Sequence, residues 1–140
     1  MYIFVMLMMA MSFMQPAPFV QQKGIEIKDA WIRPGAKDMN TALYLEIINH
    51  TNKPDTLYEA KSDLAQKVEL HETYHQGDMM GMRPAKTVAV GANSSFSFKP
   101  GGHHIMFINL RKSIKKGSSG EVTLFFRHAG QIKITPGVRK

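Results

Sequence analysis

The residues best suited to chemistry lie in one stretch of the chain, residues 71–106. It holds four of the six histidines and four of the five methionines that follow an apolar N-terminal segment. A methionine thioether is a soft, uncharged ligand that suits copper(I) and suits zinc, magnesium or calcium poorly, whereas imidazole suits several transition metals. Two imidazoles with two thioethers therefore favour a four-coordinate copper(I) site. The four candidate ligands are His71, Met82, His104 and Met106.

The surrounding elements must bring these four side chains together. His104 and Met106 are two residues apart at the start of an apolar run typical of a strand buried on both faces, so they project to the same face. His71 ends an alternating strand, and Met82 is expected in the following loop. Since loops and strand ends collect at one pole of a β-sandwich, we expect the four to meet there. The alternative is that the methionines fill the core and the histidines are ordinary polar residues.

The chain contains no cysteine. This excludes disulfides, thiolate metal sites and thiol redox chemistry, and with them the blue-copper electron-transfer site. Neutral imidazole and thioether ligands need little proton release near neutral pH. Thioethers also form no disulfides, which suits an oxidising compartment.

The spacing of the candidate ligands is distinctive. Ten residues separate His71 from Met82, twenty-one separate Met82 from His104, and one separates His104 from Met106. This pattern resembles the periplasmic copper chaperone family PCuAC, whose signature is H-x10-M-x21-H-x-M. The resemblance covers roughly residues 25–134. It extends to flanking segments at residues 29–33, 68–72, 82–84 and 99–102.

The resemblance implies an all-β, cupredoxin-like Greek-key β-sandwich that holds one copper(I) ion per chain. It also implies a metallochaperone, not an enzyme, which delivers copper to the dinuclear copper centre of cytochrome c oxidase. The acceptor would be a protein such as oxidase subunit II or a Sco-type thiol protein. The chain departs from the family at Thr73, where many members have methionine, and at His103, an added imidazole. Residues 136–140 lack the His- and Met-rich tail that binds copper(II) in some members.

Three other functions stay open at this point. A copper-sequestering or tolerance protein would use the same ligands without a delivery partner. A metal-free structural β-sandwich module would need none of them. A copper oxidase or monooxygenase would need a redox-capable site, usually richer in histidine, and no Gly-x-Ser-x-Gly elbow of a serine hydrolase is found.

Several further histidines and methionines lie near the candidate ligands. His75, Met79 and Met80 are expected in the same loop as Met82, as ordinary loop residues, although they could capture copper transiently. His103 is expected to point away from His104, to the opposite strand face. Trp31 is expected in the core, and His50 and His128 are expected in exposed turns. Met39 could approach the ligand pole, but nothing in its spacing indicates that it does.

Short β-rich segments separated by turns follow Gly24. No segment shows a long amphipathic helical pattern, and turn signals recur at intervals of about 8–12 residues, which favours an antiparallel sandwich or barrel. The expected strands cover residues 25–33, 42–48, 67–71, 87–90, 95–98, 104–110, 121–127 and 131–135.

The N-terminal segment predicts export. Residues 1–14 are apolar, and no charged side chain occurs before Lys23. A 14-residue helix spans about 21 Å, less than a bilayer core of about 30 Å, so the length fits a signal peptide although no basic residue precedes it. The alternative is an uncleaved, membrane-associating tail. We therefore expect a signal peptide and short linker in residues 1–22, and a copper-binding domain in residues 23–140 on the periplasmic or extracytoplasmic side of the envelope.

The charge is basic and uneven. The net charge is +7, and the only acid from Arg83 onward is Glu121. A basic surface can steer a protein towards an acidic partner or an anionic membrane, although a merely solvated surface is the simpler interpretation. No basic helix, aromatic RNA-binding strand or zinc finger indicates nucleic-acid binding. Membrane contact is expected only through a partner or the leader.

Overall fold

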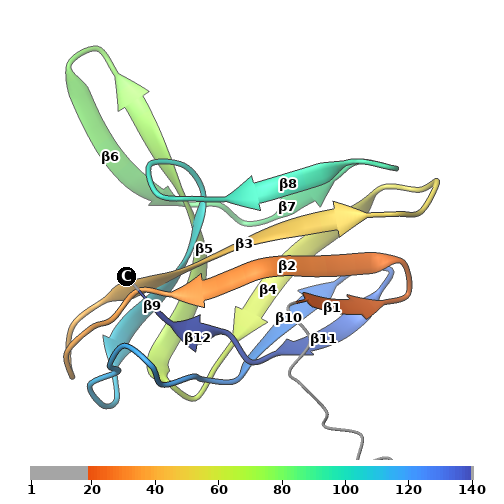
Figure 1. The fold of residues 1–140 in the computed structure, drawn as a ribbon. Helices are drawn as coiled ribbons and strands as arrows, with labels where there is room; N and C mark the ends of the chain where they lie inside the picture. The colour runs from red at the N-terminus through yellow and green to blue at the C-terminus, as the bar shows by residue number, and fades with distance from the viewer. Residues whose placement is uncertain (1–18, 140) are drawn as a thin grey trace, which may run out of the picture.

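The computed structural model describes residues 19–139, which form an all-β fold as expected (Figure 1). The described part contains strands and no helix. The strands are β1 (Phe19–Gln22), β2 (Ile25–Ile32), β3 (Thr41–Asn49), β4 (Asp55–Lys61), β5 (Ala65–Gln76), β6 (Met79–Pro84), β7 (Val88–Val90), β8 (Ser95–Phe98), β9 (His104–Leu110), β10 (Val122–Phe126), β11 (Gly130–Ile134) and β12 (Gly137–Val138).

Two sheets form the sandwich. The larger sheet has the order β1-β2-β3-β9-β5-β6, with β12 paired to β2 and β8 paired to β3. The smaller sheet has the order β11-β10-β4-β7. β3 pairs with β9 along its first residues and with β8 along its last residues, so the larger sheet divides at β3.

The core lies between the sheets and follows the alternation of the strands. Leu43, Leu45 and Ile47 of β3 are buried from the larger sheet, and Leu124 and Phe126 of β10 from the smaller one. Because side chains alternate between the two faces of a strand, the intervening residues lie on the outer faces. The outer face of the larger sheet is therefore free to carry polar and metal-binding side chains.

The β5–β6 hairpin extends beyond the sandwich. β5 pairs with β9 only as far as His71, whereas its last residues pair with β6 alone. Figure 1 shows this hairpin standing out from the body of the domain. Gly77, in the two-residue turn, has a φ of 62°, a backbone conformation that favours glycine.

Several sequence-based expectations are corrected. β5 continues to Gln76, and residues 79–84 form β6 instead of a loop. The Met-Met-Gly-Met sequence has little strand preference of its own, so pairing with β5 is what makes it a strand. β9 is buried on one face only, because Met106 and Ile108 are half-exposed. β1 occupies the last four residues of the segment interpreted as a linker.

Trp31 is also placed differently from the expectation. A bulge between Lys28 and Trp31, with Asp29 at a φ of 54°, changes the alternation of β2. Trp31 is consequently half-buried on the outer face. Its ring lies 4.9 Å from that of Tyr44 and beneath the guanidinium of Arg139.

The expected signal peptide, and the expected linker up to Pro18, lie outside the described residues. Within residues 19–139, no helix is long and apolar enough to cross a membrane.

Candidate metal centre

Two of the candidate ligands face each other across adjacent strands. His71 of β5 pairs directly with His104 of β9, and their ring centroids are 5.7 Å apart. Glu69 pairs with Met106 two residues further along the same two strands, and both side chains are on the same face as His71 and His104. The core residues Leu70 and Ile105 alternate with them, so these ligands lie on the outer face of the sheet.

Met82 comes from the next strand. It pairs with Thr73 of β5, which lies two residues beyond His71 on the same face. His104 and Met106 share their face for the same reason. All four side chains therefore project from three adjacent strands of one sheet. The expectation that they meet where strand ends and loops gather at one pole is corrected, because Met82 lies on a strand and β5 continues past His71.

Three of the four side chains line a common groove. Met82, His104 and Met106 line a groove of about 650 Å³, together with Thr73 and Met80. His71 lies outside the lining, but its ring is next to that of His104. The two imidazoles are buried, at 9% and 6% exposure, whereas Met82 is 59% exposed. Met106 is half-buried, so the site has a buried imidazole side and one exposed thioether, that of Met82.

The hydrogen bonds of His71 leave one ring nitrogen free. Its Nε2 lies 2.8 Å from Oε2 of Glu69. A carboxylate only accepts, so Nε2 carries a proton, and in the neutral imidazole the lone pair is then on Nδ1. Nδ1 is buried and has no hydrogen-bond partner. A buried polar atom without a partner is costly, and a metal ion would satisfy it.

In His104 the other ring nitrogen, Nδ1, is the donor. Its Nδ1 donates to the carbonyl of Gly102 at 3.4 Å, which leaves the Nε2 lone pair free. Burial lowers the pKa of His104 below its ordinary value of 6.5, the hydrogen bond to Gly102 acts in the opposite direction, and nearby basic groups, the Arg33 guanidinium among them, lower it further. His104 is therefore held in the neutral form that a metal ion requires.

Glu69 was not identified from the sequence, although it touches a candidate ligand. Its pKa is lowered, first by the hydrogen bond from His71 and also by Lys67, whose Nζ is 3.4 Å from Oε1. Carboxylates in this position orient a metal-binding imidazole and increase its basicity. The signal was the Glu-x-His spacing within an alternating strand, which places both side chains on one face.

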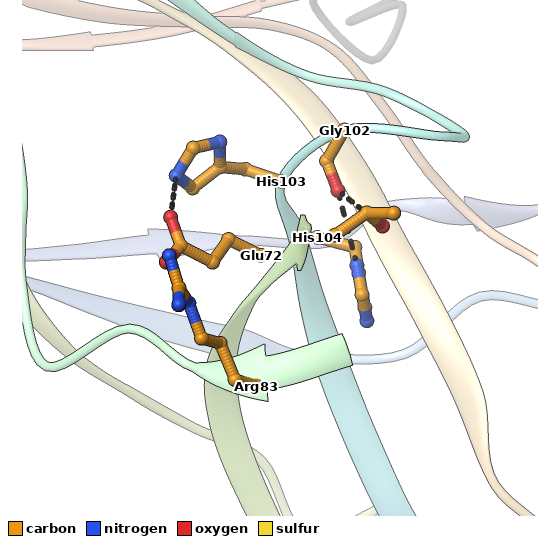
Figure 2. A network of polar contacts seen from close by, with 6 residues as sticks. Glu72, Arg83, Gly102, His103 and His104 are labelled. Atoms are coloured by element: carbon orange, nitrogen blue, oxygen red, sulfur yellow. Dashed lines mark hydrogen bonds and ion pairs between the residues drawn. The ribbon is translucent and has the colours of Figure 1, made fainter. Parts of the chain in front are cut away.

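The opposite face of the hairpin carries a charged cluster. Arg83 Nε donates to Glu72 at 2.6 Å, and the other carboxylate oxygen of Glu72 is 3.4 Å from His103 Nε2 (Figure 2). The Arg83 guanidinium also lies over the ring of Tyr74 at 5.1 Å. We call this group of Glu72, Tyr74, Arg83 and His103 the clamp. His103 therefore lies on the face opposite His104, as the alternation of side chains along the strand predicted.

Gly102 connects the hairpin to the sheet. Its carbonyl accepts hydrogen bonds from the backbone N–H and the hydroxyl of Thr73, at 3.3 and 3.1 Å, and from His104. The residue that differs from many family members, Thr73, therefore ties β5 to the segment before β9.

The remaining candidates lie apart from the four ligands or at the end of the hairpin. Met39 is exposed, and its carbonyl accepts from the N–H of Leu110, at the opposite end of β9 from His104. His50 is exposed and contacts Glu26, and His128 is exposed beside β10. His75, Met79 and Met80, expected in a loop, are on strands of the hairpin.

A family model described as "LpqE-like: Putative lipoprotein LpqE-like" matches residues 25–138. A "Putative lipoprotein Lxx21020" from Leifsonia xyli subsp. xyli is 30% identical over 110 residues, covering 78% of this chain. "Uncharacterized protein RP573" from Rickettsia prowazekii is 28% identical over 110 residues, covering 75% of this chain. The match spans 66% and 61%, respectively, of the lengths of these relatives.

Solved structures of PCuAC domains share the fold. The copper-bound PCuAC domain from PmoF2 has a TM-score of 0.72 at 24% identity, covering 86% of this chain and 97% of that domain. The solution structure of CuI-DR1885 from Deinococcus radiodurans has a TM-score of 0.67 at 23% identity, covering 89% and 82%. The expected cupredoxin-like Greek-key sandwich is confirmed by this similarity. The chain belongs to the LpqE-like family, and its fold is that of the PCuAC domains that its motif indicated.

Proposed function

We propose that this protein is a metallochaperone of the cell envelope that binds one copper(I) ion through His71, Met82, His104 and Met106. The observation that carries the proposal is the buried, unpartnered Nδ1 of His71, in a ring whose centroid lies 5.7 Å from that of His104. Each imidazole donates one N–H to a protein oxygen, so in its neutral form the other ring nitrogen offers a lone pair to a metal ion.

The donor set supports copper(I) as the cargo. Met82 and Met106 contribute two neutral thioethers on the same face as the imidazoles, and soft neutral sulfur selects copper(I) over zinc and over hard cations. Two structural neighbours are themselves described as copper-bound and as CuI forms. The copper-binding expectation agrees with both.

The unequal burial of the ligands supports delivery to a partner over permanent storage. Met82 is exposed on a hairpin that stands out from the domain, so ligands of a docked protein can reach the metal from that side (Figure 1). The partner would replace Met82 first, while the buried imidazoles keep the ion bound. Ligands would exchange stepwise, and the ion would never be free in solution.

The proposed acceptor is a protein of the cell envelope that offers thiolate ligands. The oxidase subunit II centre and Sco-type proteins are the candidates that the motif implies. Export agrees with the family description as lipoproteins and with the apolar residues 1–14. A thiolate acceptor supplies the thermodynamic pull, because thiolates bind copper(I) more strongly than thioethers do.

The test is copper(I) titration of the purified protein against a chromophoric chelator, followed by transfer to a candidate acceptor. We expect one tightly bound ion per chain, lost in both His71→Ala and Met106→Ala. Met39→Ala is a matched control, because Met39 lies at the far end of β9. Unchanged competition in both ligand variants would remove the site. Tight binding without transfer to any thiolate acceptor would instead favour sequestration.

A further inference from the structure

The outer part of the β5–β6 hairpin exposes an unusual number of thioethers. Met79, Met80 and Met82 are 73%, 70% and 59% exposed, and they are three of the five exposed large apolar side chains in the described part of the chain. A methionine that fills a core is buried. Packing therefore does not account for these three residues.

Strand register separates the three methionines into two groups. Met80 pairs directly with His75, and Met82 pairs with Thr73, on the face that carries His71. Met79 pairs with Gln76 and so lies on the face of the clamp. Directly paired residues have Cβ atoms about 4.5–5.5 Å apart, close enough for an imidazole and a thioether to reach one ion.

The His75–Met80 pair is continuous with the four-residue site. Met80 and Met82 line the same groove as His104 and Met106. Met80 and Met82 are two residues apart on one strand, a separation of about 6.8 Å along the groove. The thioethers thus form a row that leads from the exposed end of the hairpin to the buried imidazoles.

The opposite face keeps the hairpin in shape. A Cβ on Gly81 would lie 2.7 Å from the Tyr74 hydroxyl, so Tyr74 packs against the backbone of β6 at that point. The ion pair of Arg83 with Glu72 and the stacking of Arg83 on Tyr74 join the two strands. Because the charges of the clamp lie on the other face, the hairpin presents no carboxylate, lysine or arginine on the face of His75 and Met80.

We propose that His75 and Met80 form a second, transient copper(I) site at the exposed end of the hairpin, from which the ion passes by way of Met82 to the four-residue site. This inference rests on the function proposed above. Each step is a ligand exchange: a bond from copper to His75 or Met80 breaks as a bond to Met82, and then to His104 and Met106, forms. The ion stays copper(I), and no electron or proton is transferred.

The first test isolates the hairpin site in the full chain. In a His104→Asn, Met106→Leu double variant, copper(I) supplied as its acetonitrile complex is followed by NMR of methionine methyl groups and histidine rings labelled with carbon-13. We expect the Met80 methyl and the His75 ring to shift together, while the Met79 methyl does not. Equal shifts of Met79 and Met80, or no shift of Met80, would overturn the proposal. Failure of the proposed function would appear separately, as equal copper affinity of the wild type and the double variant.

The second test measures uptake by the otherwise intact protein. Transfer of copper(I) from a chromophoric chelator is followed by stopped flow in Met80→Leu and His75→Gln. We expect each variant to slow uptake by about tenfold, with an unchanged final stoichiometry. Met79→Leu, equally exposed but on the clamp face, is the matched control and should match the wild type. Wild-type rates in both test variants, or loss of the main site in either, would overturn a transient entry site.

Discussion

The two sides of the proposed metal centre differ in how the fold holds them. His71 and His104 are buried where β5 and β9 pair within the sandwich, and each ring is fixed by a hydrogen bond to Glu69 or Gly102. Met82 and Met80 are exposed on a hairpin joined to the sandwich through β5. A fixed side and an exposed side suit a protein that must hold an ion and also give it up. Pre-organisation limits the cost of binding, and exposure gives a partner access.

Stability should depend almost entirely on the sandwich and hardly on the hairpin. Phe107 of β9 is fully buried between the sheets. We expect Phe107→Ala to lower the free energy of unfolding of the metal-free protein by about 3–5 kcal/mol. Met82→Leu, at an exposed position, should change it by less than about 0.5 kcal/mol. Urea unfolding measures both, and a comparable loss in Met82→Leu would show that the hairpin is part of the cooperative core.

Copper affinity should also divide between the two sides. Removal of the buried imidazole in His104→Asn should weaken copper(I) binding by more than about 100-fold. This exceeds the loss usual when only a residue that hydrogen-bonds to a metal ligand is removed. Met82→Leu should weaken it by about tenfold, because an exposed ligand is partly replaced by water or by a neighbouring thioether. Chelator competition gives both constants. Equal losses of copper(I) affinity in the two variants would mean that Met82 contributes as much to binding as His104. They would contradict the division into a fixed side and an exposed side.

Glu69 offers a finer test of the fixed side. Its carboxylate holds the His71 N–H at 2.8 Å and selects the tautomer with Nδ1 free. In Glu69→Gln, the acceptor loses its charge, and we expect about a tenfold weaker affinity for copper(I). Glu59→Gln removes a carboxylate that is paired only with the exposed Lys61, and it should leave the affinity unchanged. An unaffected Glu69→Gln would show that packing alone orients His71.

The residue pattern predicted most of the sandwich and the identity of the candidate site. Alternation is visible in β8 and β10, which each bury one face, whereas β3 was located by its β-rich composition and is buried on both faces over its first five residues. The pattern missed β4, whose buried residues Leu57 and Ala60 are three apart because β4 has an extra residue, Tyr58, where its pairing with β10 shifts register. A bulge depends on the partner strand, so a single sequence does not reveal it.

The sequence indicated the candidate ligands, but it did not predict the strands that carry them or their hydrogen-bond partners. Spacing and donor type identified His71 and Met82, but not that both lie on strands of one sheet. β6 owes its conformation to pairing with β5, a long-range property that local propensity does not contain. For the same reason the His75–Met80 pair was taken for loop residues. Hydrogen-bond partners such as Gly102 depend on how distant segments meet, which the sequence alone does not specify.

The smallest expected effect concerns the protonation of His104 in the metal-free protein. Burial lowers its pKa below 6.5 in the folded state, whereas the unfolded chain keeps the ordinary value. Between these two pKa values the unfolded state binds more protons than the folded state. The free energy of unfolding should therefore fall as the pH drops through 6.5, and should level off once folded His104 is protonated as well.

NMR titration of the His104 ring, with urea unfolding across the same pH range, measures this effect. We expect the midpoint of His104 below 6.5, and a smaller pH dependence of stability in His104→Gln. The same neutral ring is what a copper(I) ion meets at neutral pH, so the buried side of the site needs no proton release before binding. A midpoint at or above 6.5 would mean that the ring is solvated and that the two sides of the site are alike, because the contrast between them depends on burial of the imidazoles.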